Sequence, residues 1–171
     1  MRHRLAPPWV TGDLANERWW PPTPLDRYPH MPRSDHRCWD RWLRQNHAAF
    51  TALAYDVRVG HPWDTTPEAD DDLRAIAADL TRLRADVIAA QADQLLIIEV
   101  KPHLTPGALG QALVYQSLLD QLDPQPANTI AAVLCCWAHP ALLAAARDLD
   151  IIVFESPEPA DHHTIPPFPR R

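Results

Sequence analysis

The uneven distribution of proline constrains this chain more than any other feature, because proline lacks a backbone donor and fits poorly inside helices and central strands. Seven of the nineteen prolines lie in residues 1–33 and five in residues 157–171, which leaves seven for the long stretch 35–156. The sequence therefore predicts three parts: a Pro/Trp-rich N-terminal arm over 1–34, one compact domain over 35–156 and a Pro-rich C-terminal tail over 157–171.

The predicted arm contains three tryptophans, Trp9, Trp19 and Trp20. A disordered tail rarely keeps large aromatic side chains in water. We therefore expect the arm either to pack over the protein's own surface or to dock onto a partner, which would be a second copy of the chain in a homodimer or a larger protein assembly.

Charge, cysteine content and hydropathy exclude several classes of protein. The chain has 171 residues, 46% of them hydrophobic, with a formal net charge of −6. This suits one domain with a core and argues against coating of nucleic acid through bulk positive charge, although a local basic groove stays open. Three cysteines, two of them adjacent, make no disulfide framework, so we expect a reducing, cytoplasmic location. No segment approaches the roughly eighteen apolar residues of a membrane span, so no membrane is expected.

Hydrophobic periodicity predicts alternating helices and strands. A helical stripe follows Ser34 or Asp35, where we expect the N-cap, and the apolar run at 95–98 predicts a central strand covered on both faces. Tyr55, Val57 and Val59 alternate with polar residues, as in a half-buried strand. In chain order, we predict a helix from 35, a strand over 53–60, a helix over 70–82, strands over 84–90 and 95–102, a helix over 106–122, a strand over 129–137, a helix over 140–150 and a strand over 151–155.

This order predicts an α/β fold with a mixed central sheet flanked by helices. We expect the three early strands to form a meander. Right-handed crossovers would then add the later strands.

Three charged residues lie on the two strongest predicted strands. Asp86 lies in the first, and Glu99 and Lys101 lie two residues apart in the second, so that they project from one face while Val100 points the other way. If the strands form a hairpin across residues 91–94, Asp86 lies opposite the far end of the second strand. The sequence thus predicts that two carboxylates and an ammonium converge at one edge of the sheet.

Carboxylate oxygens in this arrangement suit Mg²⁺ or Mn²⁺, which bind through one or two carboxylates together with waters and phosphate oxygens. A lysine beside such a site can orient a water and offset charge that builds on a phosphoryl oxygen, and an arginine is no substitute because it keeps its proton. Lys101 is the single lysine among sixteen Lys and Arg residues. This favours a chemical role for it.

The spacing of these charged residues is known from other proteins. Asp86 is followed, after twelve residues, by Glu99-Val100-Lys101, and these residues lie toward the ends of two predicted strands. In this respect the chain resembles the PD-(D/E)XK nuclease superfamily, with Ala85 where the family usually has a proline.

A glutamine and a tyrosine follow on the next predicted helix, at Gln111 and Tyr115. Their i, i+4 spacing places them on one helix face. It is similar to the QxxxY motif of the RecB-like and lambda-exonuclease-like branch of that superfamily. The resemblance covers about residues 36–156 and implies a restriction-endonuclease-like αβββαβ core with an added αβ unit.

The same resemblance implies a nuclease, acting as an endonuclease or an exonuclease, that hydrolyses the phosphodiester bonds of DNA with Mg²⁺ or Mn²⁺. Asp86, Glu99 and Val100 would bind the metal, and Lys101 would lie beside the attacking water. The two residues of the QxxxY motif would support the site or touch the phosphate backbone, which completes the catalytic set.

Further candidates rest on single residues. The family usually has an acidic residue on its first helix, for which Asp40 is the nearest candidate, with Asp35 behind it. Arg58, Arg84 and His103 flank the predicted site and would bind nucleic acid. The simpler structural explanations are a polar strand face for the arginines and a solvent-facing loop for the histidine.

A second class of function stays open. A structural or assembly protein of a virion or a mobile element could keep the nuclease fold and dock through its Pro/Trp-rich arms, in which case its location would include the virion. The net charge of −6 is easier to explain for such a protein. The retention of Lys101 is easier to explain for a nuclease.

Overall fold

The computed structural model describes residues 6–60, 70–73, 76, 81–122 and 128–157. The strands are β1 (Trp19–Trp20), β2 (Ala52–Val59), β3 (Leu83–Gln91), β4 (Gln94–His103), β5 (Thr129–Trp137) and β6 (Ile152–Glu155). The helices are α1 (Arg33–Asn46), α3 (Pro106–Asp120) and α4 (Pro140–Asp148), with short 3₁₀ helices at Gly12–Asn16 and His47–Ala49. Of the helix expected over 70–82, the described residues 71–73, 76 and 81 are helical, and the rest lies outside the described residues.

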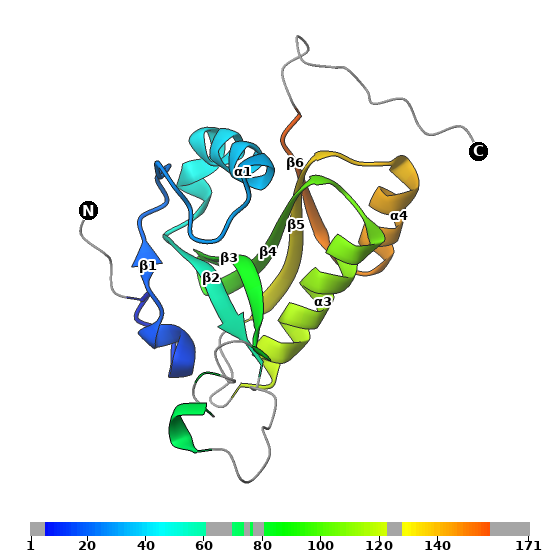
Figure 1. Ribbon diagram of the computed structural model, residues 1–171. Helices are drawn as coiled ribbons and strands as arrows, with labels where there is room; N and C mark the ends of the chain where they lie inside the picture. Colours follow the sequence, from blue (N-terminus) through cyan, green and yellow to red (C-terminus); the bar gives the residue numbers. More distant parts are fainter. Residues whose placement is uncertain (1–5, 61–69, 74–75, 77–80, 123–127, 158–171) are drawn as a thin grey trace.

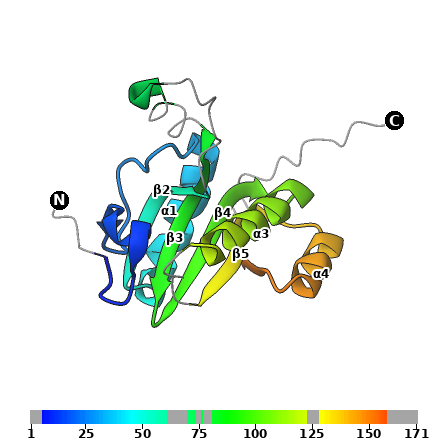
Figure 2. The same cartoon turned by 90° about the horizontal axis from the view of Figure 1, so that it is seen from below.

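The strands form one six-stranded sheet in which their spatial order is also their order along the chain. The pairs β1–β2, β2–β3 and β3–β4 are antiparallel, and the pairs β4–β5 and β5–β6 are parallel. The predicted α/β fold with a mixed sheet is thus confirmed. Figures 1 and 2 show α1 on one side of this sheet and α3 with α4 on the other.

Strand β4 lies at the centre of this arrangement because it is apolar on both faces. Leu96 and Ile98 pack with residues of α1, whereas Leu95 and Ile97 pack with Tyr115 on α3. All four residues of the apolar run are buried. Burial on both faces explains why this run reads as continuous hydrophobicity rather than as alternation.

The predicted N-terminal arm contributes a strand to this sheet. Trp19 and Trp20 pair with Ala54 and Leu53 of β2, and the indole N–H of Trp19 donates to the carbonyl of Leu14 at 2.9 Å. Trp19 is fully buried, while Trp20 is half-buried. Of the two behaviours expected for the arm, packing on the protein's own surface is therefore the one seen for this segment.

Two local predictions need correction. Helix α1 begins at Arg33 after Pro32, so neither Ser34 nor Asp35 is its N-cap. The regular alternation expected for β2 is broken at Asp56, which adopts a left-handed φ of 55°.

No helix of the described residues is long and apolar enough to cross a membrane.

Candidate active site

The candidate site forms where β3 and β4 stop pairing. The two strands are joined by a tight turn and pair from Gln91 with Gln94 to Val87 with Ile98, which is the register predicted for a hairpin across residues 91–94. Just beyond the last pair, Asp86 accepts a hydrogen bond from the backbone N–H of Val100 at 2.9 Å. The Asp86 carboxylate therefore accepts from a backbone N–H that would otherwise bond to a neighbouring strand.

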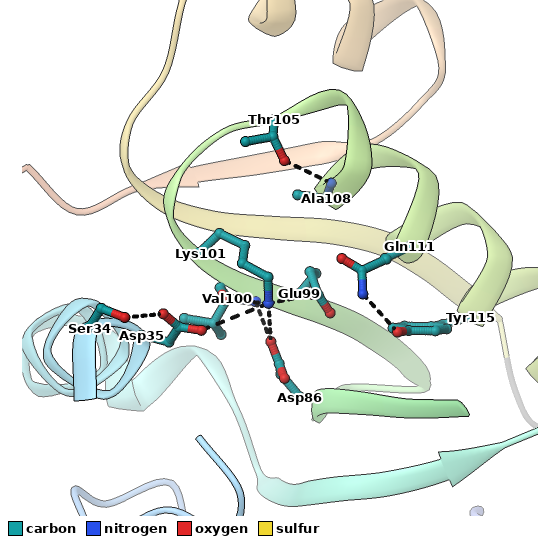
Figure 3. Close-up of polar contacts among 10 residues, drawn as sticks. All are labelled: Ser34, Asp35, Asp86, Glu99, Val100, Lys101, Thr105, Ala108, Gln111 and Tyr115. Carbon is teal, nitrogen blue, oxygen red and sulfur yellow. Dashed lines mark hydrogen bonds and ion pairs between the residues drawn. The ribbon is translucent and has the colours of Figure 1, made fainter. Parts of the chain in front are cut away.

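Glu99 and Lys101 project from β4 on the α3 side of the sheet, as the alternation of the strand requires. The Lys101 ammonium nitrogen lies 2.6 Å from Glu99 Oε1 and 3.3 Å from Asp86 Oδ2. The predicted convergence of Asp86, Glu99 and Lys101 is thus present, and Figure 3 shows all three directed toward one point.

A third carboxylate comes from α1. Asp35 is buried, with Oδ2 3.8 Å from the Lys101 nitrogen, and it accepts a hydrogen bond from the Ser34 hydroxyl at 2.7 Å. Asp40, the residue preferred from the sequence, instead pairs with Arg44 at 2.8 Å and accepts from the hydroxyl of Tyr28. The acidic residue that the first helix contributes is therefore Asp35.

A signal for Asp35 was present in the sequence. It lies three, four and seven residues before Cys38, Trp39 and Trp42, which form the buried stripe of α1. An acidic residue at the head of a buried stripe is unusual, because an unpaired charge is costly to bury. That spacing distinguishes it from Asp40, which is not on this stripe.

Burial and mutual repulsion govern the protonation of the cluster. Burial, helped by the negative charge of Asp86, raises the pKa of Glu99 to about 7, although Lys101 opposes the rise. Burial also raises the pKa of Asp86. For Lys101, burial lowers the pKa, but the hydrogen bond with Glu99 and the surrounding carboxylates outweigh it and raise the pKa above its ordinary value.

One carboxylate oxygen of the cluster, Glu99 Oε2, is buried and has no hydrogen-bond partner among the described residues. The side chain of Glu99 is only 2% exposed, so solvent is a poor substitute. Buried polar atoms are nearly always paired, and an exception calls for an explanation such as an ion.

The chemistry of these ligands fits a hard divalent cation. Asp86 and Glu99 offer carboxylate oxygens, and the carbonyl oxygen of Val100 is directed at the same place, since it accepts from the Lys101 ammonium at 3.1 Å. Mg²⁺ prefers such oxygen ligands together with water. In the geometry described, the cation among these oxygens is the lysine itself, and no group of three His, Cys, Asp or Glu side chains in the described part of the chain is arranged as a ready metal site.

The glutamine and tyrosine of the predicted motif lie beside this cluster on α3. The helix is started by Thr105, whose hydroxyl accepts from the N–H of Ala108 at 3.1 Å, and by Pro106 at its first turn. Gln111 donates to the Tyr115 hydroxyl at 3.1 Å. Burial raises the pKa of Tyr115, and the charge of the nearby carboxylates raises it further.

The three residues expected to bind nucleic acid lie in two places. Arg58 and Arg84 are paired in register on β2 and β3, where Arg84 forms an ion pair with Asp56. His103 is exposed at the end of β4, with its ring 6.0 Å from that of Trp137. The sequence did not predict a function for Trp137, because nothing in the apolar run of β5 distinguishes an exposed tryptophan from a buried one.

Comparison with protein-family models, with curated proteins and with solved structures gives no match to this chain.

Proposed function

We propose that this protein is a Mg²⁺-dependent deoxyribonuclease that hydrolyses the phosphodiester bonds of DNA. The observation that carries the proposal is a buried excess of negative charge at the point where β3 and β4 separate. Three carboxylates from three elements face one ammonium at 2.6, 3.3 and 3.8 Å. When all are ionised, two negative charges remain unbalanced, and the buried Glu99 Oε2 has no hydrogen-bond partner among the described residues.

A divalent cation balances such a charge, whereas burial of uncompensated carboxylates is unfavourable. Asp86, Glu99 and the carbonyl oxygen of Val100 would hold it. When bound, a metal of this kind polarises a phosphoryl oxygen and lowers the pKa of a bound water. Lys101 would act in its charged form as a compact donor near these oxygens, which the wider guanidinium fork of an arginine does not match, and its raised pKa favours that form.

The chain's own residues supply the remaining parts of a hydrolytic site. The Lys101 ammonium has three donors, so it can hold a water and also donate to a phosphoryl oxygen as negative charge develops there. Asp35 and Asp86 would keep this flexible side chain over the site. Gln111 and Tyr115, joined by their hydrogen bond, line the α3 side and would orient the phosphate backbone.

The arrangement of elements also supports the proposal. Helix α1 is followed by the antiparallel strands β2, β3 and β4, then by α3 and the parallel strand β5. This is the αβββαβ order that the resemblance to the PD-(D/E)XK superfamily implies, and α4 with β6 supplies the expected added αβ unit. We propose that the core is of the restriction-endonuclease-like type.

The test is cleavage of linear, nicked, single-stranded and branched DNA in the presence of Mg²⁺, Mn²⁺ or EDTA. Wild type is compared with Asp86→Ala and Lys101→Ala, and with Asp40→Asn as a control acid on α1 that pairs with Arg44. We expect metal-dependent cutting by wild type and the control, reduced at least about a hundredfold in the other two. No cutting of any DNA by wild type, or cutting that both substitutions leave intact, would contradict the proposal.

One observation favours an assembly protein instead. The Lys101 ammonium already contacts all three carboxylates, and a protein that only keeps the fold needs no other cation. The two functions separate by metal binding, because a relic cluster held by lysine would show no rise in melting temperature with Mg²⁺. Such a protein would also have to dock without Trp19, which is buried in its own sheet.

A further inference from the structure

An exposed aromatic platform lies beside the candidate site, at the carboxyl ends of two parallel strands. Trp137 ends β5 and is 46% exposed. Its ring lies 6.0 Å from that of His103 at the end of β4 and 6.3 Å from that of His139, both in edge-to-face geometry. The two imidazoles flank the indole, while nearly half of its surface stays open to solvent.

The platform faces the same side of the sheet as the catalytic cluster. On β5, Val133 and Cys135 pack with α3 and α4, and Trp137 continues that alternation. In the parallel register, Lys101 pairs with Cys135 and His103 pairs with Trp137. The platform is therefore one strand across and two residues beyond Lys101, a separation of about 8 Å between Cα atoms.

We infer that Trp137, with His103 and His139, stacks an unpaired nucleobase next to the phosphate held at Lys101. This inference rests on the proposed function and names its substrate class: DNA that is single-stranded, or frayed, beside the bond to be cut. Stacking on an aromatic ring requires an exposed base face, and a base inside a duplex has none to offer.

The size and setting of the platform favour a base over a protein partner. A stable protein interface buries roughly 800 Å² on each side, whereas a single indole flanked by two imidazoles matches one base. None of the other exposed large hydrophobic side chains of the described residues lies at the carboxyl end of β4 or β5: Leu83 and Ile152 begin β3 and β6, Val114 lies on α3, and Leu149 follows α4. Ligands of parallel strands also bind outside their carboxyl ends, which is where this tryptophan lies.

Stacking is tested by binding, without cleavage. A fluorescein-labelled single strand, the same strand with abasic sites and the corresponding duplex are titrated in EDTA with the full chain, and the dissociation constants are read by anisotropy. Wild type is compared with Trp137→Ala, Trp137→Phe and the control Leu149→Ala, which removes a side chain of similar exposure at the other end of α4.

We expect Trp137→Ala to weaken binding of the normal single strand about tenfold, with Trp137→Phe within about threefold of wild type and Leu149→Ala unchanged. Wild type should discriminate against the abasic strand by a similar factor, and Trp137→Ala should lose that discrimination. The abasic comparison needs no variant, so it holds even if Trp137→Ala folds poorly.

Equal binding of normal and abasic strands by wild type would overturn the inference. So would an equal loss by Trp137→Ala on single strand and duplex, no measurable binding of any single strand, or self-association abolished by Trp137→Ala, which would identify a protein contact. If base discrimination holds but Mg²⁺-dependent cleavage is absent, the nuclease proposal fails while the platform stands. If cleavage holds and discrimination does not, only the substrate class is wrong.

Discussion

Two aspartates lie at the same level of the sheet but have different charged partners. Tyr55 pairs with Val87 and Val57 pairs with Ala85, so Asp56 and Asp86 lie between the same two pairs, on β2 and β3. Asp56 forms an ion pair with Arg84, and the imidazole of His30 lies 3.5 Å from its carboxylate. Asp86 instead joins Glu99 and Asp35 around one lysine.

The difference lies in charge balance rather than in burial. The Asp56 side chain is 14% exposed and the Asp86 side chain 22%, so neither is freely solvated. An acid matched by an adjacent guanidinium is complete as a structural pair. An acid that shares a single ammonium with two others is not, and this incompleteness is what a cation-dependent site requires.

The largest expected effect is on DNA cleavage by the aspartate pair itself. Asp86→Asn removes a ligand charge and should reduce Mg²⁺-dependent cleavage at least about a hundredfold, whereas Asp56→Asn should stay within about threefold of wild type. Asparagine is nearly isosteric and tolerates a positive φ, so both variants should fold. Initial rates on the preferred DNA at matched folding provide the measurement, and equal losses in the two variants would show that Asp86 has no special role in cleavage.

A smaller effect is expected on metal-induced stability. A ligand at a hundred times its dissociation constant stabilises the folded state by about 2.7 kcal/mol, which corresponds to a rise in melting temperature of roughly 5–10 °C for a chain of this size. We expect Mg²⁺ to produce such a rise in wild type and in Asp56→Asn but not in Glu99→Gln, because Glu99 offers the unpaired oxygen. Thermal unfolding with Mg²⁺ and with EDTA tests it, and an undiminished rise in Glu99→Gln would place the metal elsewhere.

The pH dependence of the metal-free protein should show an effect of comparable size. The pKa of Glu99 is raised from 4.5 to about 7 in the folded state, so its contribution to stability is present below about pH 4.5 and is lost as pH rises through about 7. In EDTA, the free energy of unfolding of wild type should therefore fall between these values relative to that of Glu99→Gln. Denaturant titrations at pH 4.5, 6 and 8 supply the difference, and parallel curves for the two proteins would refute a raised pKa.

Much of this distinction could be predicted from the sequence. The apolar run at 95–98 identified the central strand, and the two-residue spacing of Glu99 and Lys101 placed both on one face. The hairpin register then followed from the short stretch at 91–94, and it brought Asp86 to them. These are local rules, set by the period of a strand and the length of a turn.

What the sequence did not predict depends on contacts between distant segments. The pairing of Trp19 with Ala54 joins residues far apart in the chain, and the sequence predicted packing on the protein's own surface or docking onto a partner without indicating β2 as the contact. The approach of Asp35 to Lys101 depends on how α1 crosses the sheet. A helix can cross in several ways, so the position of Asp35 on the buried stripe of α1 indicates the face it occupies but not that it reaches Lys101.

The break in β2 was also beyond sequence periodicity. In the sequence, Tyr55, Val57 and Val59 alternate with polar residues, which would place all three on one face of the sheet. In the structure, Tyr55 packs with residues of α1, and the two valines pack on the opposite face. The left-handed conformation of Asp56 coincides with the switch, and the paired residues of β3 change faces at the same level, since Val87 packs with Tyr55 and Ala85 packs with Val57. Aspartate tolerates this conformation better than most residues, but its identity alone does not demand it.

The smallest expected effect concerns the compensated aspartate. Asp56→Asn should cost about 1 kcal/mol or less, since a partly exposed ion pair contributes little, and its cost should shrink as salt is raised. Asp56→Ala should cost about 1–2 kcal/mol more, because alanine must adopt the same positive φ without a polar side chain to support it. Urea unfolding of both variants at low and high salt separates charge from backbone strain. Equal stabilities for Asn and Ala at this position would mean that the backbone of β2 relaxes when the side chain is lost. The change of face along β2 would then depend on the ion pair with Arg84 rather than on the left-handed conformation at residue 56.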